Sequence, residues 1–319
     1  MRALLLLFLL GTSIAAQAQT GSGPKALEYD RNAPIDVREI GVTKRGDIEV
    51  HDISYASPKG GRVPAYLVVP PGKGPFAAVI WGHWYWGNSE ARNRTAVLDE
   101  AVVLAKSGVV SLLTDGPVAR PGHVEDKEPL NEQQVTDLIQ QVTDMERGAD
   151  LLLARKDIDA KRLAYVGHSY DATVGAFLSG VDKRFKAFVL MAGGLSDEVD
   201  MKSKEYRDYR EKIGAEKFDA FQAKYAWLDP GKFVSHAAPA TVFLQYATKE
   251  DFLTVERAKE YAANVSEPKK FQVYEAPHAL NAAARRDRVA FLVEQLKVKA
   301  PDAAAVAAIP ELFQPATQE

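Results

Sequence analysis

One serine in the chain has the surroundings that a nucleophile needs. Ser169 lies in YVGHSYDATVG, after the short apolar run LAYV and before a small-residue stretch that starts at Ala172. A serine in a tight turn from a buried strand into a helix stands at the carboxyl end of a sheet. There the first amides of the helix and its positive dipole end face a developing oxyanion. The alternative is a serine that only caps the helix.

Serine needs an adjacent base, usually a histidine that a carboxylate orients. Of the six histidines, His278 is the best placed, because it directly follows the apolar run FQVYEA and precedes the last long helical stretch. A lone loop histidine is often without function, and His51, His123 and His236 have no comparable setting. His168 is next to Ser169 in sequence, so we expect its side chain to point away from the serine and shape the turn.

The carboxylate should follow the preceding strand, TVFLQY, which continues as ATKEDFLTV. Glu250 and Asp251 are adjacent there, and one of them should face His278. If the strand ends near Tyr246, a three-residue turn delivers Glu250, which we favour over Asp251. Asp115, after an earlier strand, is a weaker third candidate.

An oxyanion hole requires backbone donors from two places. One is the amide of Tyr170, directly after the nucleophile, and the other is the amide of Tyr85 or Trp84 in the loop GHWYWGN. Trp84 and Trp86, with the nearby tyrosines, suggest an aromatic substrate pocket for an apolar group. Ordinary aromatic packing around a loop is the alternative.

Asp171 stands where the G-x-S-x-G pattern would have its second glycine. An acid there implies a wider turn or an outward-facing side chain, and Ala172 and Gly175 can still provide close packing. A negative charge suits the first turn of a helix but would oppose an oxyanion if it pointed inward. We therefore expect Asp171 to point away, and Asp171→Gly to change activity only modestly.

Short β-branched runs alternate with amphipathic stretches from about Asp47 onward, which predicts a sheet covered by helices on both faces. The first two strands, joined through SPKGGR, are expected to form an antiparallel pair at the sheet edge, and the later apolar runs read as buried parallel strands. We expect eight strands at 47–54, 63–69, 77–81, 109–114, 163–166, 188–192, 241–245 and 271–274, and helices at 92–107, 131–156, 172–180, 255–263 and 281–296.

We divide the chain into four segments. Residues 1–18 predict a secretory signal peptide, with Arg2, an apolar run too short to span a bilayer comfortably, and cleavage after Ala18. An uncleaved membrane anchor is the alternative. Residues 19–46 form an N-terminal extension, 47–298 the main domain, and 299–319 a loosely docked tail. The charged, tyrosine-rich insert at about 196–233 predicts a small helical cap or a solvated surface element.

The composition argues against several classes of function. With 40 basic and 43 acidic side chains, the net charge of −3 gives no electrostatic reason to expect nucleic acid or an anionic membrane as a partner. The absence of cysteine excludes a thiol nucleophile and a disulfide framework, so a large core must carry stability. We find no dinucleotide or phosphate-loop motif and no metal-binding histidine pair, and expect no cofactor and no metal.

The order Ser169, Glu250 or Asp251, His278, with an H-x-x-x-G loop upstream, resembles the α/β-hydrolase fold. The paired opening strands, the GHSY turn and the PHALN loop resemble the dienelactone hydrolase, acetyl xylan esterase and prolyl-oligopeptidase-like branch. This resemblance spans roughly residues 47–296. It implies hydrolysis of an ester or peptide bond through an acyl-enzyme, without a cofactor.

These observations lead to one main hypothesis and two alternatives. The main one is an exported serine hydrolase, periplasmic or extracellular after processing, that cleaves a small-molecule carboxylic ester. The first alternative is a serine peptidase on short peptides, although the chain has no room for a long N-terminal propeller domain. The second is a catalytically inactive binding protein that keeps the fold, which Asp171 alone favours.

Overall fold

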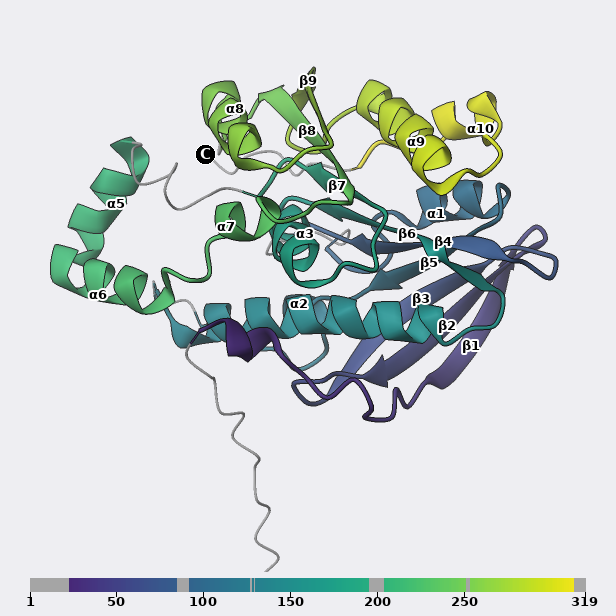
Figure 1. The fold of residues 1–319 in the computed structure, drawn as a ribbon, viewed down its shortest axis with the longest axis horizontal. Coiled ribbons are helices and arrows are strands. Elements are labelled where there is room, and N and C mark those ends of the chain that lie inside the picture. Colours follow the sequence, from purple (N-terminus) through teal and green to yellow (C-terminus); the bar gives the residue numbers. More distant parts are fainter. Residues whose placement is uncertain are drawn as a thin grey trace, which may run out of the picture.

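The computed structural model describes residues 23–84, 92–126, 128, 130–194, 204–250 and 253–312. Its centre is a single sheet that takes in strands from β1 to β9 (Figure 1). The expected signal peptide, residues 1–18, lies outside the described residues. Across the ranges that are described, no helix combines the length and the apolar character needed to cross a membrane.

The sheet is parallel over most of its width. Its order is β1-β2-β3-β5-β4-β6-β7-β8-β9, and every neighbouring pair from β5 to β9 is parallel, whereas β1, β2 and β3 join it antiparallel. The central strands are buried on both faces, which explains their continuous apolar runs. The bounds are β1 Arg38–Arg45, β2 Ile48–Ala56, β3 Arg62–Val69, β4 Phe76–Gly82, β5 Val109–Thr114, β6 Ile158–His168, β7 Ala187–Met191, β8 Thr241–Lys249 and β9 Lys269–Pro277.

The predicted fold class is confirmed, and the sheet has one strand more than the eight we expected. The additional strand, β1, lies in the predicted N-terminal extension, pairs with β2 and takes the edge position. β2 and β3 are antiparallel as predicted, but they are not the sheet edge. Every residue of β1 is exposed. Only Ile40 and Val42 alternate as apolar residues along it, which is too short a pattern to identify a strand among the charged residues around them.

Helices cover both faces of the sheet, and each face has its own buried apolar cluster (Figure 1). Helices α2, α3, α7 and α8 pack on one face, and α1, α9 and α10 on the other. The bounds are η1 Pro24–Leu27, α1 Leu98–Ala105, η2 Pro117–Ala119, α2 Glu132–Leu153, α3 Tyr170–Val181, α5 Lys204–Ile213, α6 Ala215–Tyr225, α7 Pro230–Val234, α8 Val255–Asn264, α9 Ala282–Leu296 and α10 Ala303–Ala307.

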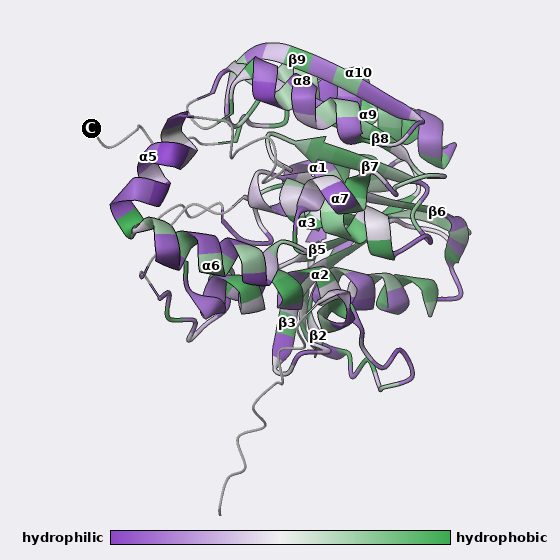
Figure 2. Cartoon of the chain, turned by 60° about the vertical axis from the view of Figure 1, so that its left-hand side comes forward, coloured by the Kyte–Doolittle hydropathy of each residue, from purple (hydrophilic) through white to green (hydrophobic). Residues whose placement is uncertain are grey.

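Helices α5 and α6 and most of α7 lie in the described part of the insert predicted at about 196–233. α5 stands away from the body of the molecule, and its surface is largely hydrophilic (Figure 2). Helices α5 and α6 hold each other through aromatic contacts, with the Tyr206 and Phe218 rings 5.0 Å apart and edge to face. An ion pair of 2.7 Å from Lys224 to Glu132 ties α6 to the start of α2. The role of this insert as a cap stays a prediction.

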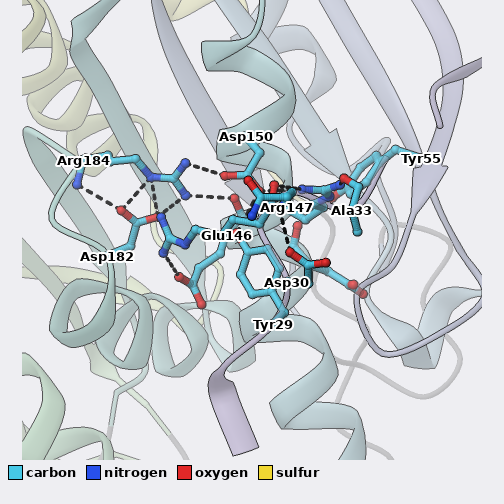
Figure 3. A network of polar contacts seen from close by, with 12 residues as sticks. Tyr29, Asp30, Ala33, Tyr55, Glu146, Arg147, Asp150, Asp182 and Arg184 are labelled. Carbon is cyan, nitrogen blue, oxygen red and sulfur yellow. Dashed lines mark hydrogen bonds and ion pairs between the residues drawn. The ribbon is translucent and has the colours of Figure 1, made fainter. Parts of the chain in front are cut away.

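The segment before β1 is fastened to the second half of α2 by polar contacts (Figure 3). Tyr29 donates a hydrogen bond of 2.9 Å to Asp150, and Arg31 forms an ion pair of 2.8 Å with Glu146. Arg147 donates back to the main-chain carbonyl of Arg31. These contacts hold the chain in place where it has few apolar residues to bury.

The described part of the expected tail, residues 299–312, packs on α9. Helix α10 buries Val306, and Arg285 of α9 donates to the main-chain carbonyls of Val306 and Pro310 at 3.4 and 3.0 Å. Arginine can satisfy several carbonyls at once because its five donors lie in one plane.

Candidate active site

Ser169 occupies the turn between β6 and α3 in a strained main-chain conformation. Its φ and ψ are 56° and −114°, a region that a non-glycine residue enters only where the surrounding structure enforces it. The amide of Ser169 donates to the carbonyl of Met191 at 2.7 Å, which holds the turn against β7. A Cβ atom on Gly193 would lie 2.1 Å from the Ser169 carbonyl, so only glycine permits this approach.

The structure brings Ser169, His278 and Glu250 together in one line of hydrogen bonds. Ser169 Oγ lies 2.8 Å from His278 Nε2, and His278 Nδ1 lies 2.7 and 2.9 Å from the two carboxylate oxygens of Glu250. The side chains of His278 and Glu250 are only 9% and 2% exposed. An ionised carboxylate can only accept, so Nδ1 carries the proton and Nε2 is left to accept from the serine hydroxyl.

Parallel strand order explains why residues so far apart in sequence meet. Ser169 follows β6, Glu250 follows β8 and His278 follows β9, and all three strands run in the same direction. Their carboxyl ends therefore lie along one edge of the sheet. Strand β8 continues to Lys249, beyond the end expected near Tyr246, so the strand itself delivers Glu250 without a three-residue turn.

The other two acid candidates have different positions. Asp251 lies outside the described residues. Asp115 accepts hydrogen bonds from the amide of Arg94 at 2.7 Å and from its guanidinium at 3.1 Å. Asp115 thus serves to hold Arg94, which also reaches Asp52.

The side chain of His168 points away from Ser169, as expected, and contacts His278. Its Nε2 lies 2.8 Å from the main-chain carbonyl of His278, so it donates there, and the two rings are 5.0 Å apart. Burial, together with the positive charge that His278 acquires, lowers the pKa of His168 to about 3. His168 therefore stays neutral while it fixes the loop that carries His278.

The expected oxyanion donors come from the start of α3 and from the loop after β4. Tyr170 is the first residue of α3, so its amide belongs to the turn whose N–H groups point beyond the helix end. Trp84 follows β4, and its side chain is 2% exposed and packs 5.2 Å from the His168 ring. Tyr85 and Trp86, the other residues expected in the oxyanion hole and the substrate pocket, lie outside the described residues.

The His83 ring holds this loop in place through two hydrogen bonds. Its Nδ1 donates to the carbonyl of Trp84 at 2.8 Å, and its Nε2 accepts from the amide of Gly116 at 3.2 Å. Burial is the main reason that the pKa of His83 falls to about 4, so the ring is neutral and each nitrogen has one role. Within the described residues, no cluster of three or more histidine, aspartate or glutamate side chains could hold a metal ion.

Solved structures with the same architecture are esterases and related hydrolases. An acetyl xylan esterase from Paenibacillus sp. R4 aligns over 85% of this chain and 92% of its own, with a TM-score of 0.68 at 18% identity. Acetyl xylan esterase 1 from Thermoanaerobacterium sp. JW/SL YS485 gives 0.66 at 16%, over 85% and 91%. A glucuronoyl esterase from Solibacter usitatus gives 0.59 at 14%, also over 85% and 91%.

The chain has the α/β-hydrolase fold. The fold class that the residue pattern indicated is thereby confirmed. No protein-family model matches the sequence, and no curated protein matches it either.

One departure from the α/β-hydrolase pattern is Asp171, and our expectation of an outward-facing side chain is wrong. Asp171 is fully buried. Its Oδ1 accepts from Gln141 Nε2 at 2.7 Å and from the Tyr165 hydroxyl at 3.2 Å. The inward orientation follows from a space left by Gly82, because a Cβ there would lie 2.4 Å from the Asp171 carboxyl carbon. Gly175 does provide the close packing expected of it, against Tyr165 and Leu190.

Gln141 is the residue of this site that the sequence analysis missed. Gln141 lies among the apolar residues of α2, three residues after Leu138 and four before Met145. The side chain is only 1% exposed. A polar residue on the buried stripe of an amphipathic helix requires a partner, and that signal was available in the sequence.

Proposed function

We propose that the protein is a serine hydrolase that cleaves carboxylic esters through an acyl-enzyme intermediate. The observation that carries this proposal is the continuous hydrogen-bonded line from Ser169 through His278 to Glu250. A serine that merely capped α3 would use its hydroxyl on a helix amide, whereas the Ser169 side chain makes no such cap.

The geometry fits general-base activation of the serine. As Oγ attacks the acyl carbon, its proton passes to His278 Nε2, and the carboxylate of Glu250 stabilises the imidazolium that forms. The amides of Tyr170 and of Trp84 or Tyr85 receive the oxyanion. The tetrahedral intermediate then collapses, His278 returns the proton to the departing alcohol, and water attacks the acyl-serine by the same steps in reverse order.

An ester substrate is favoured over a peptide by the structural neighbours. The solved structures named above are an acetyl xylan esterase pair and a glucuronoyl esterase, and a further neighbour is a cold-adapted esterase. Their identities are low, so the acyl group and the alcohol of the substrate are not transferred to this chain. We take a small-molecule carboxylic ester as the substrate class.

Labelling with a fluorophosphonate tests the nucleophile. We expect one adduct on Ser169 of the folded protein and none on Ser169→Ala, with unchanged melting temperature as the control for folding. An unlabelled wild-type protein would support the inactive binding protein instead. Turnover of a short-chain nitrophenyl ester should exceed that of an aminoacyl nitroanilide, and the opposite preference would identify a peptidase.

We also propose that the protein is exported and processed after Ala18. The support is the basic residue, apolar run and small-residue segment of positions 1–18. Expression of the full chain in a bacterial host, followed by fractionation and N-terminal sequencing, should give a periplasmic or secreted form that begins at Gln19. A form that keeps Met1 and stays with the membrane would identify an uncleaved anchor.

A further inference from the structure

The carboxyl group of Asp171 lies between the two chain segments that supply the oxyanion donors. Its own main chain follows Tyr170, in the first turn of α3. Its side chain fills the space over Gly82, the last residue of β4, where a Cβ would approach to 2.4 Å. Asp171 is therefore packed directly against the start of the loop that continues through His83 and Trp84.

All the partners of this carboxyl group in the described part of the chain are neutral donors. Gln141 Nε2 and the Tyr165 hydroxyl donate to Oδ1, whereas Oδ2 is buried without a hydrogen-bond partner among the described residues. The Tyr165 hydroxyl additionally binds the main-chain carbonyl of Asp171 at 2.8 Å, so the side chain and the first turn of α3 are held together.

Gly82 connects this group to the loop in which we propose the second oxyanion donor. His83 and Trp84 follow Gly82 directly, and the His83 ring already fixes the Trp84 carbonyl and the Gly116 amide. The Asp171 side chain packed over Gly82 adds a contact from the helix that carries Tyr170. The distance between the start of this loop and Tyr170 therefore depends on the Asp171 side chain, because a glycine at position 171 would leave the space over Gly82 empty.

We propose that Asp171 is a positioning residue that fastens the loop of His83 and Trp84 to the start of α3 and so sets the spacing of the two oxyanion donors. This inference rests on the proposed hydrolase function. The Asp171 side chain packs over Gly82, where a glycine at position 171 would leave a gap, and Gln141 of α2 and Tyr165 of β6 hold the side chain in place by hydrogen bonds.

Three variants separate positioning from general support of the fold. Asp171→Ala empties the space over Gly82, and Asp171→Asn keeps the shape of the side chain and a carbonyl acceptor for Gln141 Nε2. The side-chain NH₂ group that Asp171→Asn introduces can donate to Gln141 Oε1, a buried oxygen with no hydrogen-bond partner among the described residues. Leu178→Ala, two turns further along α3 and fully buried, is the control for lost packing without contact to the loop.

We expect Asp171→Ala to lower kcat by about 10- to 100-fold with KM changed less than about 2-fold, as for a weakened oxyanion hole. Labelling by a fluorophosphonate should slow by a similar factor. Asp171→Asn should recover most of the activity, and Leu178→Ala should lower the melting temperature with wild-type kcat. All rates are measured at a temperature where each variant is folded by circular dichroism.

The outcomes distinguish this inference from the proposed function. If wild type is labelled and Asp171→Ala keeps its kcat, the positioning role is wrong and the hydrolase stands. If Asp171→Ala and Leu178→Ala lose activity only in proportion to their loss of folded protein, Asp171 is structural and the inference is equally wrong. A wild-type protein that neither labels nor turns over an ester overturns both.

Discussion

Two buried polar regions lie along helix α2, and they are built from different chemistry. Near its middle, Gln141 donates a hydrogen bond to Asp171, close to the loop of His83 and Trp84. The Asp171 carboxyl group has only neutral donors around it among the described residues. In its second half, Glu146, Arg147 and Asp150 belong to the network of Figure 3, which also includes Arg184. There, carboxylates and guanidinium groups face one another.

The difference reflects what each region has to hold. The network of Figure 3 joins the N-terminal segment, α2 and the turn after α3 through ion pairs and hydrogen bonds, whose partners need only stay near each other. Asp171 lies beside the place where we propose that a negative charge develops, and neutral donors fix its position without a fixed positive charge. Burial without a cation raises the pKa of Asp171 to about 7. The network therefore serves stability, whereas Asp171 and Gln141 serve the geometry of the reaction.

The sharpest test of this contrast uses two buried glutamates. Glu250→Gln removes the charge that orients and stabilises His278, and we expect kcat to fall by about 10⁴-fold, because the analogous change in a serine protease triad has that effect. Glu146→Gln, in the network, should leave kcat unchanged. Steady-state kinetics on a nitrophenyl ester measures kcat of both variants. Comparable losses of kcat in the two variants would contradict the difference between the two regions.

Breaking the ion-pair network should affect stability alone. Arg184 contacts both Asp150 and Asp182, whose side chains are 12% and 1% exposed. Asp150 keeps its contacts with Arg147 and Tyr29, so Arg184→Met leaves mainly the shielded Asp182 without an ion-pair partner among the described residues. We expect a loss of about 3 kcal/mol in the free energy of unfolding, measured by urea denaturation. The kcat of the folded fraction should equal that of wild type, and a fall would show that the network extends to the site.

The pH dependence of the free energy of unfolding should reveal the raised pKa of the Asp171 carboxyl group. A carboxyl whose pKa is raised in the folded state, from 3.8 to about 7, holds its proton more tightly there than in the unfolded chain. Stability contributed by this group is therefore present at low pH and lost as the pH rises through that window. Asp171→Asn cannot ionise, so wild type should lose about 2–4 kcal/mol relative to this variant between pH 4 and pH 8. Parallel urea denaturation curves of the two proteins across this range measure the difference, and a constant difference would contradict the raised pKa.

A smaller effect should come from the fit between Gly82 and Asp171. Gly82→Ala places a methyl group against the carboxyl, and overpacking of this kind costs about 1–3 kcal/mol. Asp171→Gly opens the space that the methyl group needs, so the double variant should be more stable than Gly82→Ala alone. Thermal unfolding of the four proteins measures this coupling, and strict additivity would show that the two residues do not compete for the same space. The burial of Asp171 also replaces our initial expectation of a modest effect for Asp171→Gly with a clear loss of activity.

The smallest effect is expected on the α5–α6 insert. Arg210 and Asp219 form an exposed ion pair, with side chains 40% and 56% exposed. Exposed pairs contribute about 0–1 kcal/mol, so Arg210→Ala should shift the melting temperature little and leave kcat unchanged. A change in KM with unchanged stability would instead support the cap role predicted for this insert.

The sequence was sufficient for a mostly parallel sheet and for Ser169 and His278, and it reduced the acid to Glu250 or Asp251. These features are local: apolar runs mark buried strands, and Ser169, Glu250 and His278 each stand next to the end of one. Strand β1 was missed because its apolar alternation is short and lies among charged residues. The choice of Glu250, which the sequence favoured over Asp251, agrees with the contact to His278.

Only the tertiary structure decided the direction of Asp171 and the roles of Gln141 and His83. A side chain in the first turn of a helix can point to solvent or inward, and the sequence around Asp171 is compatible with both. The choice depends on the space over Gly82 and on donors from α2 and β6, which are distant in sequence. Sequence reasoning therefore placed the reacting groups at one edge of the sheet, whereas the packing of elements from separate parts of the chain determined how they are held.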